Sequence, residues 1–167
     1  SNAEIDALEW LPVGKARKRV SYDHDREILD RFARRVEAKT ARTFPFIVLR
    51  HAKTVPGEAW DGPDATRPLM QRGVDQATSV AAGIAAYRPE RIVSSTAVRC
   101  LSTVAPLAAA TGIRVRQTAD LSQDAHDFGQ ANVVEVVAKR LRRRQGVVLC
   151  SHGPVLPDIV AELAHLT

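Results

Sequence analysis

The hydrophobic and polar positions of the chain form short apolar runs separated by longer stretches with helical spacing. Four runs rich in Val, Ile and Leu are short enough to be strands buried on both faces. They predict strands at residues 44–49, 91–94, 113–116 and 146–150. Between and after them, apolar residues recur every three or four positions, which predicts helices at 70–87, 97–111, 133–143 and 155–166. This alternation favours an α/β fold, a mainly parallel sheet with helices on both faces in three α/β/α layers.

Glycines mark the ends of two predicted helices. Gly112 directly follows the helix at 97–111, and Gly146 lies after the helix at 133–143, as the first residue of the last predicted strand. Glycine often ends a helix because it adopts a left-handed backbone conformation without strain. We therefore expect both glycines to act as helix stops.

Residues 4–40 form a region of their own, ahead of a domain at 41–167. The segment 8–13 predicts a short strand closed by a proline. The segment 23–37 predicts an amphipathic helix that starts at an aspartate cap and carries Ile28, Leu29, Phe32 and Val36 on one face. Residues 1–3 (Ser-Asn-Ala) resemble the remnant of an expression tag and are excluded from this reasoning.

Composition narrows the class of protein. The 167 residues, 45% of them hydrophobic, can bury the core of one medium-sized domain. The sequence has no apolar run long enough to span a membrane and no secretory signal segment. Its two cysteines, Cys100 and Cys150, lack metal-ligand spacing, so we expect reduced core residues in a cytoplasmic protein that has no membrane partner.

The net charge of +5 includes basic clusters at residues 15–19 and 139–144. Such clusters can bind nucleic acid. The second cluster ends a predicted helix, where cations interact favourably with the helix dipole. Because no aromatic interleaving or known reading motif accompanies the charge, we do not expect nucleic acid as the partner; a basic nucleic-acid or partner-docking domain is kept as an alternative.

Cationic side chains follow three of the predicted strands. The first strand ends in Arg50 and His51, the second is followed by Arg99, and the last is followed by His152. Ligands of open α/β sheets bind outside the carboxyl ends of the strands. If these strand ends converge, two arginines and two histidines form a pocket for a small anion.

These three stretches resemble motifs of the histidine phosphatase superfamily, which shares its fold with phosphoglycerate mutases. They read L-R-H-A-K-T, S-S-T-A-V-R-C-L-S-T and S-H-G, and R-P-L-M-Q-R-G-V-D-Q-A is also similar to a stretch common in that family. The alanine after Arg-His is typical of the SixA-like branch. The resemblance covers residues 44 to about 165, and it implies a further strand after the last helix, so the C-terminus is expected to be truncated.

The resemblance implies a role for each motif residue. His51 would be the nucleophile that forms phosphohistidine, while Arg50, Arg99 and His152 would hold the phosphate with support from Ser151 and Lys53. Since these cations supply the positive charge that phosphoryl transfer requires, no metal and no cofactor is expected. His51 must be neutral to attack, and we expect the neighbouring arginine charges to lower its pKa and a backbone carbonyl to bind its other ring nitrogen.

The general acid is the point where the chain departs from the family. Members that hydrolyse alkyl phosphates generally carry a Glu after the third strand, whereas this chain has Gln123 there. Asp124 is the best substitute and His126 the next. A weak acid favours leaving groups that need little protonation, so the expected substrates are small phosphoanhydrides such as nucleotides, or phosphohistidine on a protein. A catalytically weak module that only binds phospho-ligands is the alternative.

A second resemblance lies in the N-terminal region. The phrases E-I-D-A-L-E-W-L-P-V-G-K-A and Y-D-H-D-R-E-I-L look like the closing strand and helix of a Nudix hydrolase domain, although the Nudix box itself is absent from the sequence. This implies a preceding Nudix domain in the full-length protein. The alternative is a helical arm that packs on the phosphatase domain.

Overall fold

The computed structural model describes residues 7–166 and divides the chain into two compact units, residues 1–43 and 44–167. Every strand found among the described residues lies in the second unit. Its strands are β1 (Phe46–Arg50), β2 (Arg91–Ser95), β3 (Val115–Thr118) and β4 (Val147–Ser151). Its α-helices are α3 (Gln71–Ala86), α4 (Val98–Thr111), α5 (Gln123–Asp127), α6 (Val133–Arg143) and α7 (Leu156–Leu166), and three short 3-10 turns lie at 57–59, 64–66 and 119–121.

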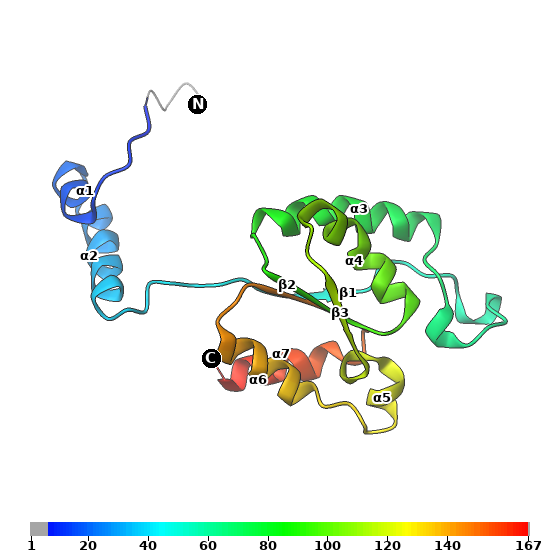
Figure 1. Ribbon diagram of the computed structural model, residues 1–167. Coiled ribbons are helices and arrows are strands. Elements are labelled where there is room, and N and C mark those ends of the chain that lie inside the picture. The colour runs from blue at the N-terminus through cyan, green and yellow to red at the C-terminus, as the bar shows by residue number, and fades with distance from the viewer. Residues whose placement is uncertain (1–6, 167) are drawn as a thin grey trace. The chain divides into compact units, whose positions relative to one another are not determined.

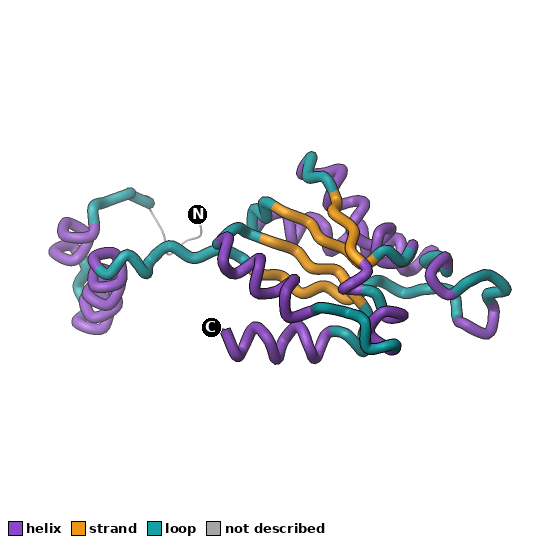
Figure 2. The backbone as a smooth tube through the Cα atoms, turned by 60° about the horizontal axis from the view of Figure 1, so that its bottom comes forward, coloured by secondary structure: helices purple, strands orange, loops and turns teal. Residues whose placement is uncertain are grey.

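The four strands form one sheet in the order β1-β4-β2-β3, and all its pairings are parallel. Helices α3 and α4 cover one face, and α6 and α7 cover the other (Figure 1). Figure 2 shows the strands running side by side between these helices. The predicted α/β fold, with its parallel sheet between two helical layers, is confirmed.

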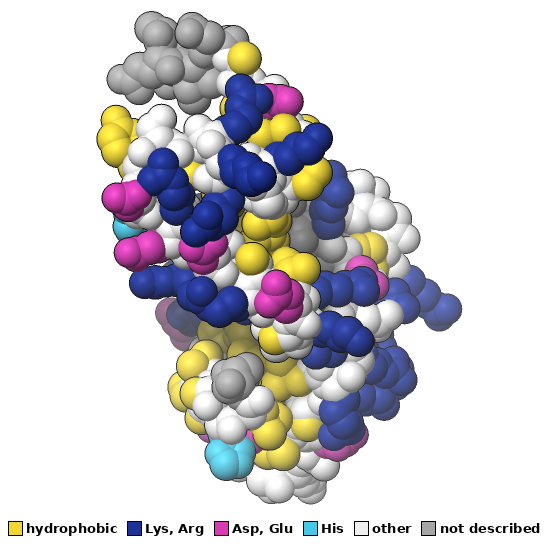
Figure 3. All heavy atoms as spheres, turned by 90° about the vertical axis from the view of Figure 1, so that its left-hand side faces the viewer, with side chains coloured by type: hydrophobic (Ala, Val, Ile, Leu, Met, Phe, Trp, Pro, Cys, Tyr) yellow, Lys and Arg dark blue, Asp and Glu magenta, His cyan; other side chains and the backbone are white. Residues whose placement is uncertain are grey.

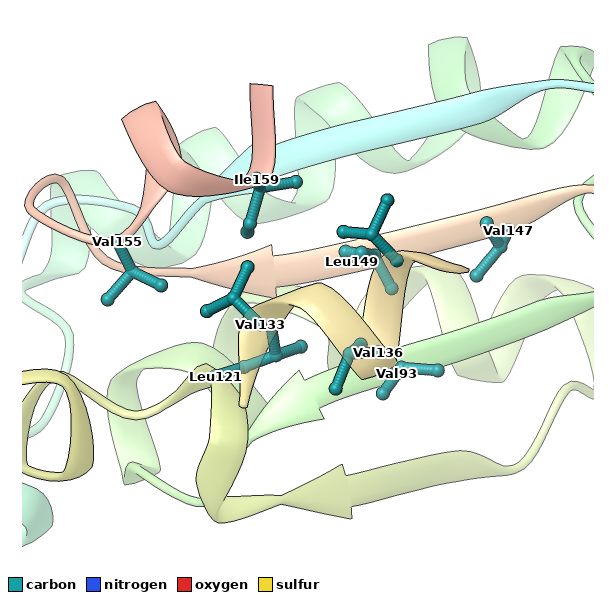
Figure 4. Packing of buried hydrophobic residues seen from close by; sticks show 9 residues of the cluster. Val93, Leu121, Val133, Val136, Val147, Leu149, Val155 and Ile159 are labelled. Carbon is teal, nitrogen blue, oxygen red and sulfur yellow. The ribbon is translucent and has the colours of Figure 1, made fainter. Parts of the chain in front are cut away.

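Alternation along each central strand divides the core between the two faces. In β4, Val147 and Leu149 pack with α6 and α7, whereas Val148 and Cys150 pack with α3 and α4. Figure 4 shows the first of these clusters, in which β4 side chains meet Ile159 and the inner face of α6. Burial on both faces explains why β4 appears in the sequence as a continuous apolar run.

The N-terminal unit contains two helices, α1 (Val13–Arg19) and α2 (Asp23–Glu37). The helix predicted at 23–37 is confirmed. The strand predicted at 8–13 is wrong, because residues 7–12 have no regular structure and Pro12 is the N-cap of α1. A basic last turn stabilises α1 at its C-terminus, and an ion pair between Arg17 and Asp30 joins it to α2.

Two other predictions in the second unit need correction. Strand β3 begins two residues later than the predicted 113–116. Gly112 ends α4 with a left-handed backbone (φ 69°), as expected, but α6 is capped by Arg144, also left-handed (φ 48°). Gly146 serves a different purpose, because a Cβ there would lie 3.0 Å from the Pro45 side chain and 3.3 Å from the Pro89 backbone.

Of the helices formed by described residues, none has the length and apolar content that a membrane span requires.

Candidate active site

The carboxyl ends of β1 and β4 bring the two predicted histidines together. The His51 backbone N–H donates to the carbonyl oxygen of Ser151 at 3.0 Å, which extends the β1–β4 pairing by one residue. The rings of His51 and His152 then meet edge to face, with centroids 5.3 Å apart. Arg99 enters from the first turn of α4, with its Nε 3.3 Å from Nδ1 of His152. The structure therefore joins three of the four predicted cationic residues in one contact network.

The imidazole of His51 is set up as a neutral ring. Its Nδ1 lies 2.9 Å from the carbonyl oxygen of Ala52, and because a carbonyl can only accept, Nδ1 carries the proton. Nε2 is then the unprotonated nitrogen. Burial, with smaller contributions from the charges of Arg99 and Arg50, lowers the pKa of His51 to about 4. The expected backbone partner and the lowered pKa are both confirmed, but burial rather than arginine charge is the larger cause.

Arg99 is 1% exposed and is held on both sides. Besides the contact of Nε with His152, its Nη1 donates to the carbonyl oxygen of Asp64 at 2.6 Å, and its Nη2 lies 2.8 Å from the Asp64 carboxylate. A guanidinium has five N–H donors. The three contacts use three of these donors, so two N–H groups of Arg99 are left over.

His152 is fully buried, and both of its ring nitrogens have partners within the protein. Because Nδ1 accepts from Arg99, Nε2 carries the proton and donates to the Ser95 hydroxyl at 2.9 Å. The Cys100 sulfur lies 3.5 Å from the same Nε2. Because both ring nitrogens are already engaged within the protein, the expected donation of His152 to a phosphate stays a prediction that requires a change of partners.

A hollow of about 320 Å³ opens beside His51. Arg50, His51, Lys53 and Gln76 are among the residues that line it. The side chains of Arg50 and Lys53 are exposed, so their charges face the solvent side of the hollow. A tetrahedral anion there would meet the cations of Arg50 and Lys53 and the imidazole of His51.

The segment that follows His51 is held by helices α3 and α4. The Ala52 N–H donates to the Thr103 hydroxyl at 2.9 Å, and the Lys53 N–H donates to Oε1 of Gln76 at 3.0 Å. A Cβ on Gly73 would lie 2.0 Å from the carbonyl oxygen of Lys53, so only glycine allows α3 to approach this closely. This contact gives a physical reason for the glycine in the R-P-L-M-Q-R-G stretch.

The hydroxyl of Ser151 does not lie at the hollow. It is fully buried and donates to the carbonyl oxygen of Leu121 at 2.7 Å. Ser151 instead contributes through its backbone carbonyl, which accepts from the His51 N–H. Its expected support of the phosphate is thus replaced by support of the nucleophile's backbone.

The two acid candidates lie in α5, which follows β3 in the chain and contacts α7 through His126. The Asp124 side chain is exposed, and within the described residues no hydrogen bond or ion pair joins it to Arg50, His51, Arg99 or His152. Nε2 of His126 lies 3.0 Å from the Asp158 carboxylate. The structure therefore does not bring either acid candidate into contact with the cationic residues.

Asp64 is the carboxylate that does contact the site, and our sequence reasoning missed it. It binds Arg99, and its Oδ1 accepts from Nε of Arg67 at 2.8 Å. Although burial acts to raise it, the hydrogen bond from Arg67 and the charges of Arg99 and Arg67 hold the pKa of Asp64 below its usual value. The three-residue spacing of Asp64 and Arg67 in the sequence could have indicated their ion pair. The contact of Asp64 with Arg99 joins residues 35 positions apart, which no local pattern indicates.

Within residues 7–166, no three His, Cys, Asp or Glu side chains are grouped as a metal site would require. Cys100 and Cys150 are free and buried, as the sequence predicted. The described residues form a cationic hollow beside an imidazole with one unprotonated nitrogen, an arrangement compatible with phosphoryl transfer.

Known proteins resemble the chain in sequence. The family model of the histidine phosphatase superfamily (branch 1) matches residues 46–132, about half of the chain. An 8-oxo-(d)GTP phosphatase of Mycolicibacterium smegmatis is 30% identical over 164 residues, which cover 95% of this chain and 48% of that protein. The chain thus spans about half the length of this relative.

Solved structures resemble it as well. A protein described as a phosphohistidine phosphatase SixA, from Agrobacterium tumefaciens, is 30% identical and superimposes with a TM-score of 0.55 over 67% of this chain and 72% of that one. The protein histidine phosphatase SixA in complex with tungstate has a TM-score of 0.58 over 70% of this chain and 74% of its own, at 19% identity. The second likeness is one of fold alone.

Proposed function

Because this chain belongs to the histidine phosphatase superfamily (branch 1), we propose that it hydrolyses phosphorylated compounds through a phosphohistidine at His51. One observation carries the proposal. The His51 ring is half-buried, holds its proton on Nδ1 against the Ala52 carbonyl, and has a pKa of about 4, so Nε2 is unprotonated at neutral pH beside Arg50 and Arg99.

In the proposed mechanism, Nε2 of His51 attacks phosphorus while the leaving group departs on the opposite side. Arg50 and the two remaining N–H groups of Arg99 bind the phosphoryl oxygens and neutralise the charge that spreads over them. Lys53 adds a further charge at the rim of the hollow. Water then attacks the phosphohistidine, which releases phosphate and restores the neutral ring. These side chains supply the charge stabilisation, so the proposed reaction needs no metal ion.

The substrates we propose are nucleotide phosphoanhydrides. Their phosphate leaving group needs little protonation, which suits a site whose contacting carboxylate, Asp64, is held ionised by two arginines. The nucleotide phosphatase of M. smegmatis also matches 95% of this chain, including the N-terminal unit, whereas the A. tumefaciens SixA structure covers 67%.

Phosphohistidine on a protein is the second candidate substrate. Its imidazole leaving group also departs with little help from an acid, and the A. tumefaciens SixA relative supports it. The hollow beside His51 is open, and a side chain of a docked protein could enter it.

The substrate proposal is tested by comparing nucleoside diphosphates, a phosphohistidine protein, alkyl phosphates and p-nitrophenyl phosphate side by side. We expect turnover of the anhydride and the aryl ester, and a rate on alkyl phosphates lower by roughly 10²–10⁴, the usual contribution of a general acid. If Asp124 serves as the acid, D124N will slow alkyl phosphates selectively. A clear preference for sugar phosphates would contradict the proposal, and absence of any turnover between about pH 5 and 8, around the histidine reference pKa, would favour a binding module.

We also propose that residues 4–40 are the end of a preceding Nudix domain. In support, no residue of α1 or α2 is buried, and Ile28, Phe32 and Val36 expose about half of their surface on one face of α2. An apolar helix face of this kind is normally covered within a domain. The coding sequence upstream of this chain tests the proposal, which fails if that sequence encodes no Nudix box.

A further inference from the structure

A charged residue lies on the buried face of α6. The inner stripe of this helix consists of Val133, Val136, Val137 and Arg140. The first three pack in the core against β2 and β4, as Figure 4 shows for two of them. Arg140 continues the stripe and is only 6% exposed, and its Nε is buried without a hydrogen-bond partner. A buried, unpaired guanidinium nitrogen is costly, and native structures normally give it a partner.

The nearest charges around Arg140 have the same sign. Strand residues alternate between faces, so Arg91 lies on the α6 side of β2 together with Val93. The register pairs Val93 with Arg116, which places Arg116 on the same side of the edge strand β3. Burial, followed by the charges of Arg116, Arg143 and Arg91, lowers the pKa of Arg140. Arg140 is thus surrounded by cations from both the sheet and its own helix.

The carboxylates of this region have other partners. Asp120 accepts from the Thr118 hydroxyl and the Asn132 N–H, Glu135 binds Arg142, and Glu90 accepts from the Gly146 N–H. Among the residues that the structure describes, no ion pair reaches the cluster of cations formed by Arg91, Arg116, Lys139, Arg140 and Arg143, which we call the arginine cluster. In Figure 3, which looks onto the amino ends of the strands, Lys and Arg side chains gather along one side of the lower half of the view.

A cavity lies at the arginine cluster. Its volume is about 90 Å³, and Arg116, Lys139 and Arg140 line it together with Asp120 and Glu135. A shallow surface depression over residues 114–117 adjoins it through Arg116. A water occupies roughly 30 Å³ in the liquid, so the cavity has the size of one small tetrahedral anion and its shell rather than of a nucleoside.

We propose that the arginine cluster is a second phosphate-binding site, in which one phosphate group sits against Arg140 and Arg116. The phosphate comes either from free inorganic phosphate or from the end of a nucleotide whose remaining part lies over the depression at 114–117. Arginine provides the planar fork that binds phosphate oxygens in pairs. The cavity runs along β3 from Arg116 to Thr118, on the side of the sheet that α6 covers. Because β3 and β1 are opposite edge strands of the sheet, the site is separate from the hollow beside His51.

The experiment is a titration of the full chain followed by amide chemical shifts in two-dimensional nuclear magnetic resonance. Inorganic phosphate should move two sets of amides with saturating curves, one around His51 and one at residues 115–118 and 136–141. ADP and adenosine distinguish the sources. If ADP shifts the second set of amides more than inorganic phosphate does, the ligand is a nucleotide. If the two shift it equally, the ligand is free phosphate. Adenosine, which has no phosphate, should not shift this set.

Substitutions then assign the second set to the cluster. R140Q should weaken phosphate binding there about tenfold or more and leave the shifts around His51 unchanged. Arg116 is exposed, so Arg116→Gln serves as a second variant if R140Q folds poorly. The matched control is Arg142→Gln, because Arg142 lies on the same helix but is exposed and paired with Glu135.

Four results would overturn the proposal. The first is the absence of shifts at 115–118 and 136–141. The second is an equal effect of sodium chloride at the same ionic strength, which would indicate screening alone. The third is an R142Q effect as large as that of R140Q. Much tighter binding of a single-stranded oligonucleotide over the same amides would also count against it, because it would identify a nucleic-acid surface.

Discussion

The imidazole of His51 titrates far from its usual value in water. Its pKa is about 4, against 6.5 for an unperturbed histidine, and burial is the main cause. The hydrogen bond from Nδ1 to the Ala52 carbonyl leaves Nε2 unprotonated, as the proposed mechanism requires. The same surroundings of the ring make a prediction about stability.

The free energy of unfolding should fall in acid because of His51. The unfolded chain takes up a proton near pH 6.5, whereas the folded chain does so near pH 4. The unfolded state therefore binds more protons between these values, and this contribution to stability, complete above pH 6.5, is lost progressively down to about pH 4. Urea unfolding at several pH values should show a smaller acid loss in H51N than in the wild type. An equal loss in both proteins would contradict the assigned pKa, and H24N, at an exposed position, is the control.

A second prediction concerns Asp64, which holds Arg99 through both its carboxylate and its backbone carbonyl. D64N removes the charge that orients the guanidinium, so we expect kcat/KM to fall about tenfold, mostly through KM. The control is Asp61→Asn, because Asp61 is exposed in the same loop. This variant should change kcat/KM little. Tighter substrate binding in D64N would mean that Asp64 competes with the phosphate instead of positioning its partner.

Among the elements, the start of α3 has the greatest influence on the site. Gly73 lets this helix approach the carbonyl oxygen of Lys53, and Gln76 binds the Lys53 N–H one turn later. The helix therefore fixes the segment directly after the nucleophile, although none of its residues was expected at the site. Its two interior glycines offer a matched pair of substitutions.

Gly73→Ala should destabilise the fold by about 3 kcal/mol and reduce kcat, because its Cβ would overlap the Lys53 carbonyl and displace the residues after His51. Gly83→Ala lies in the same helix with no atom within 4 Å of the added Cβ, so it should stabilise by about 1 kcal/mol and leave kcat unchanged. Thermal unfolding and steady-state kinetics measure both effects. Similar behaviour of the two variants would contradict the close approach.

For the whole molecule, the sequence predicted helix and strand positions best in the core, for example in β4, which is buried on both faces of the sheet. The strand β4 and the helices α4 and α6 lie close to their predicted positions, because continuous apolar runs and three-to-four spacing are local signals. The strand expected at 8–13 failed because a short apolar run before a proline also fits the entry to a helix, which is what Pro12 provides.

The site was predictable to the same extent, through the local motifs that end each strand. His51, Arg99 and His152 meet as expected because parallel strands end at one edge of the sheet. The hydroxyl partner of Ser151 and the role of Asp64 depend on contacts between segments 30 and 35 residues apart, which no local pattern records. The position of Asp124 relative to His51 likewise depends on how distant segments fold together, so the sequence alone could not predict it.

The central claim is that His51 becomes phosphorylated during turnover, and a rapid-quench experiment tests it most directly. Protein mixed with ³²P-labelled p-nitrophenyl phosphate and quenched within milliseconds should carry label that is stable in base, labile in acid and located on the peptide containing His51. H51A should carry none, whereas H165A, at an exposed position in α7, should be labelled like the wild type. Label on an aspartate or serine, or undiminished label in H51A, would contradict the claim.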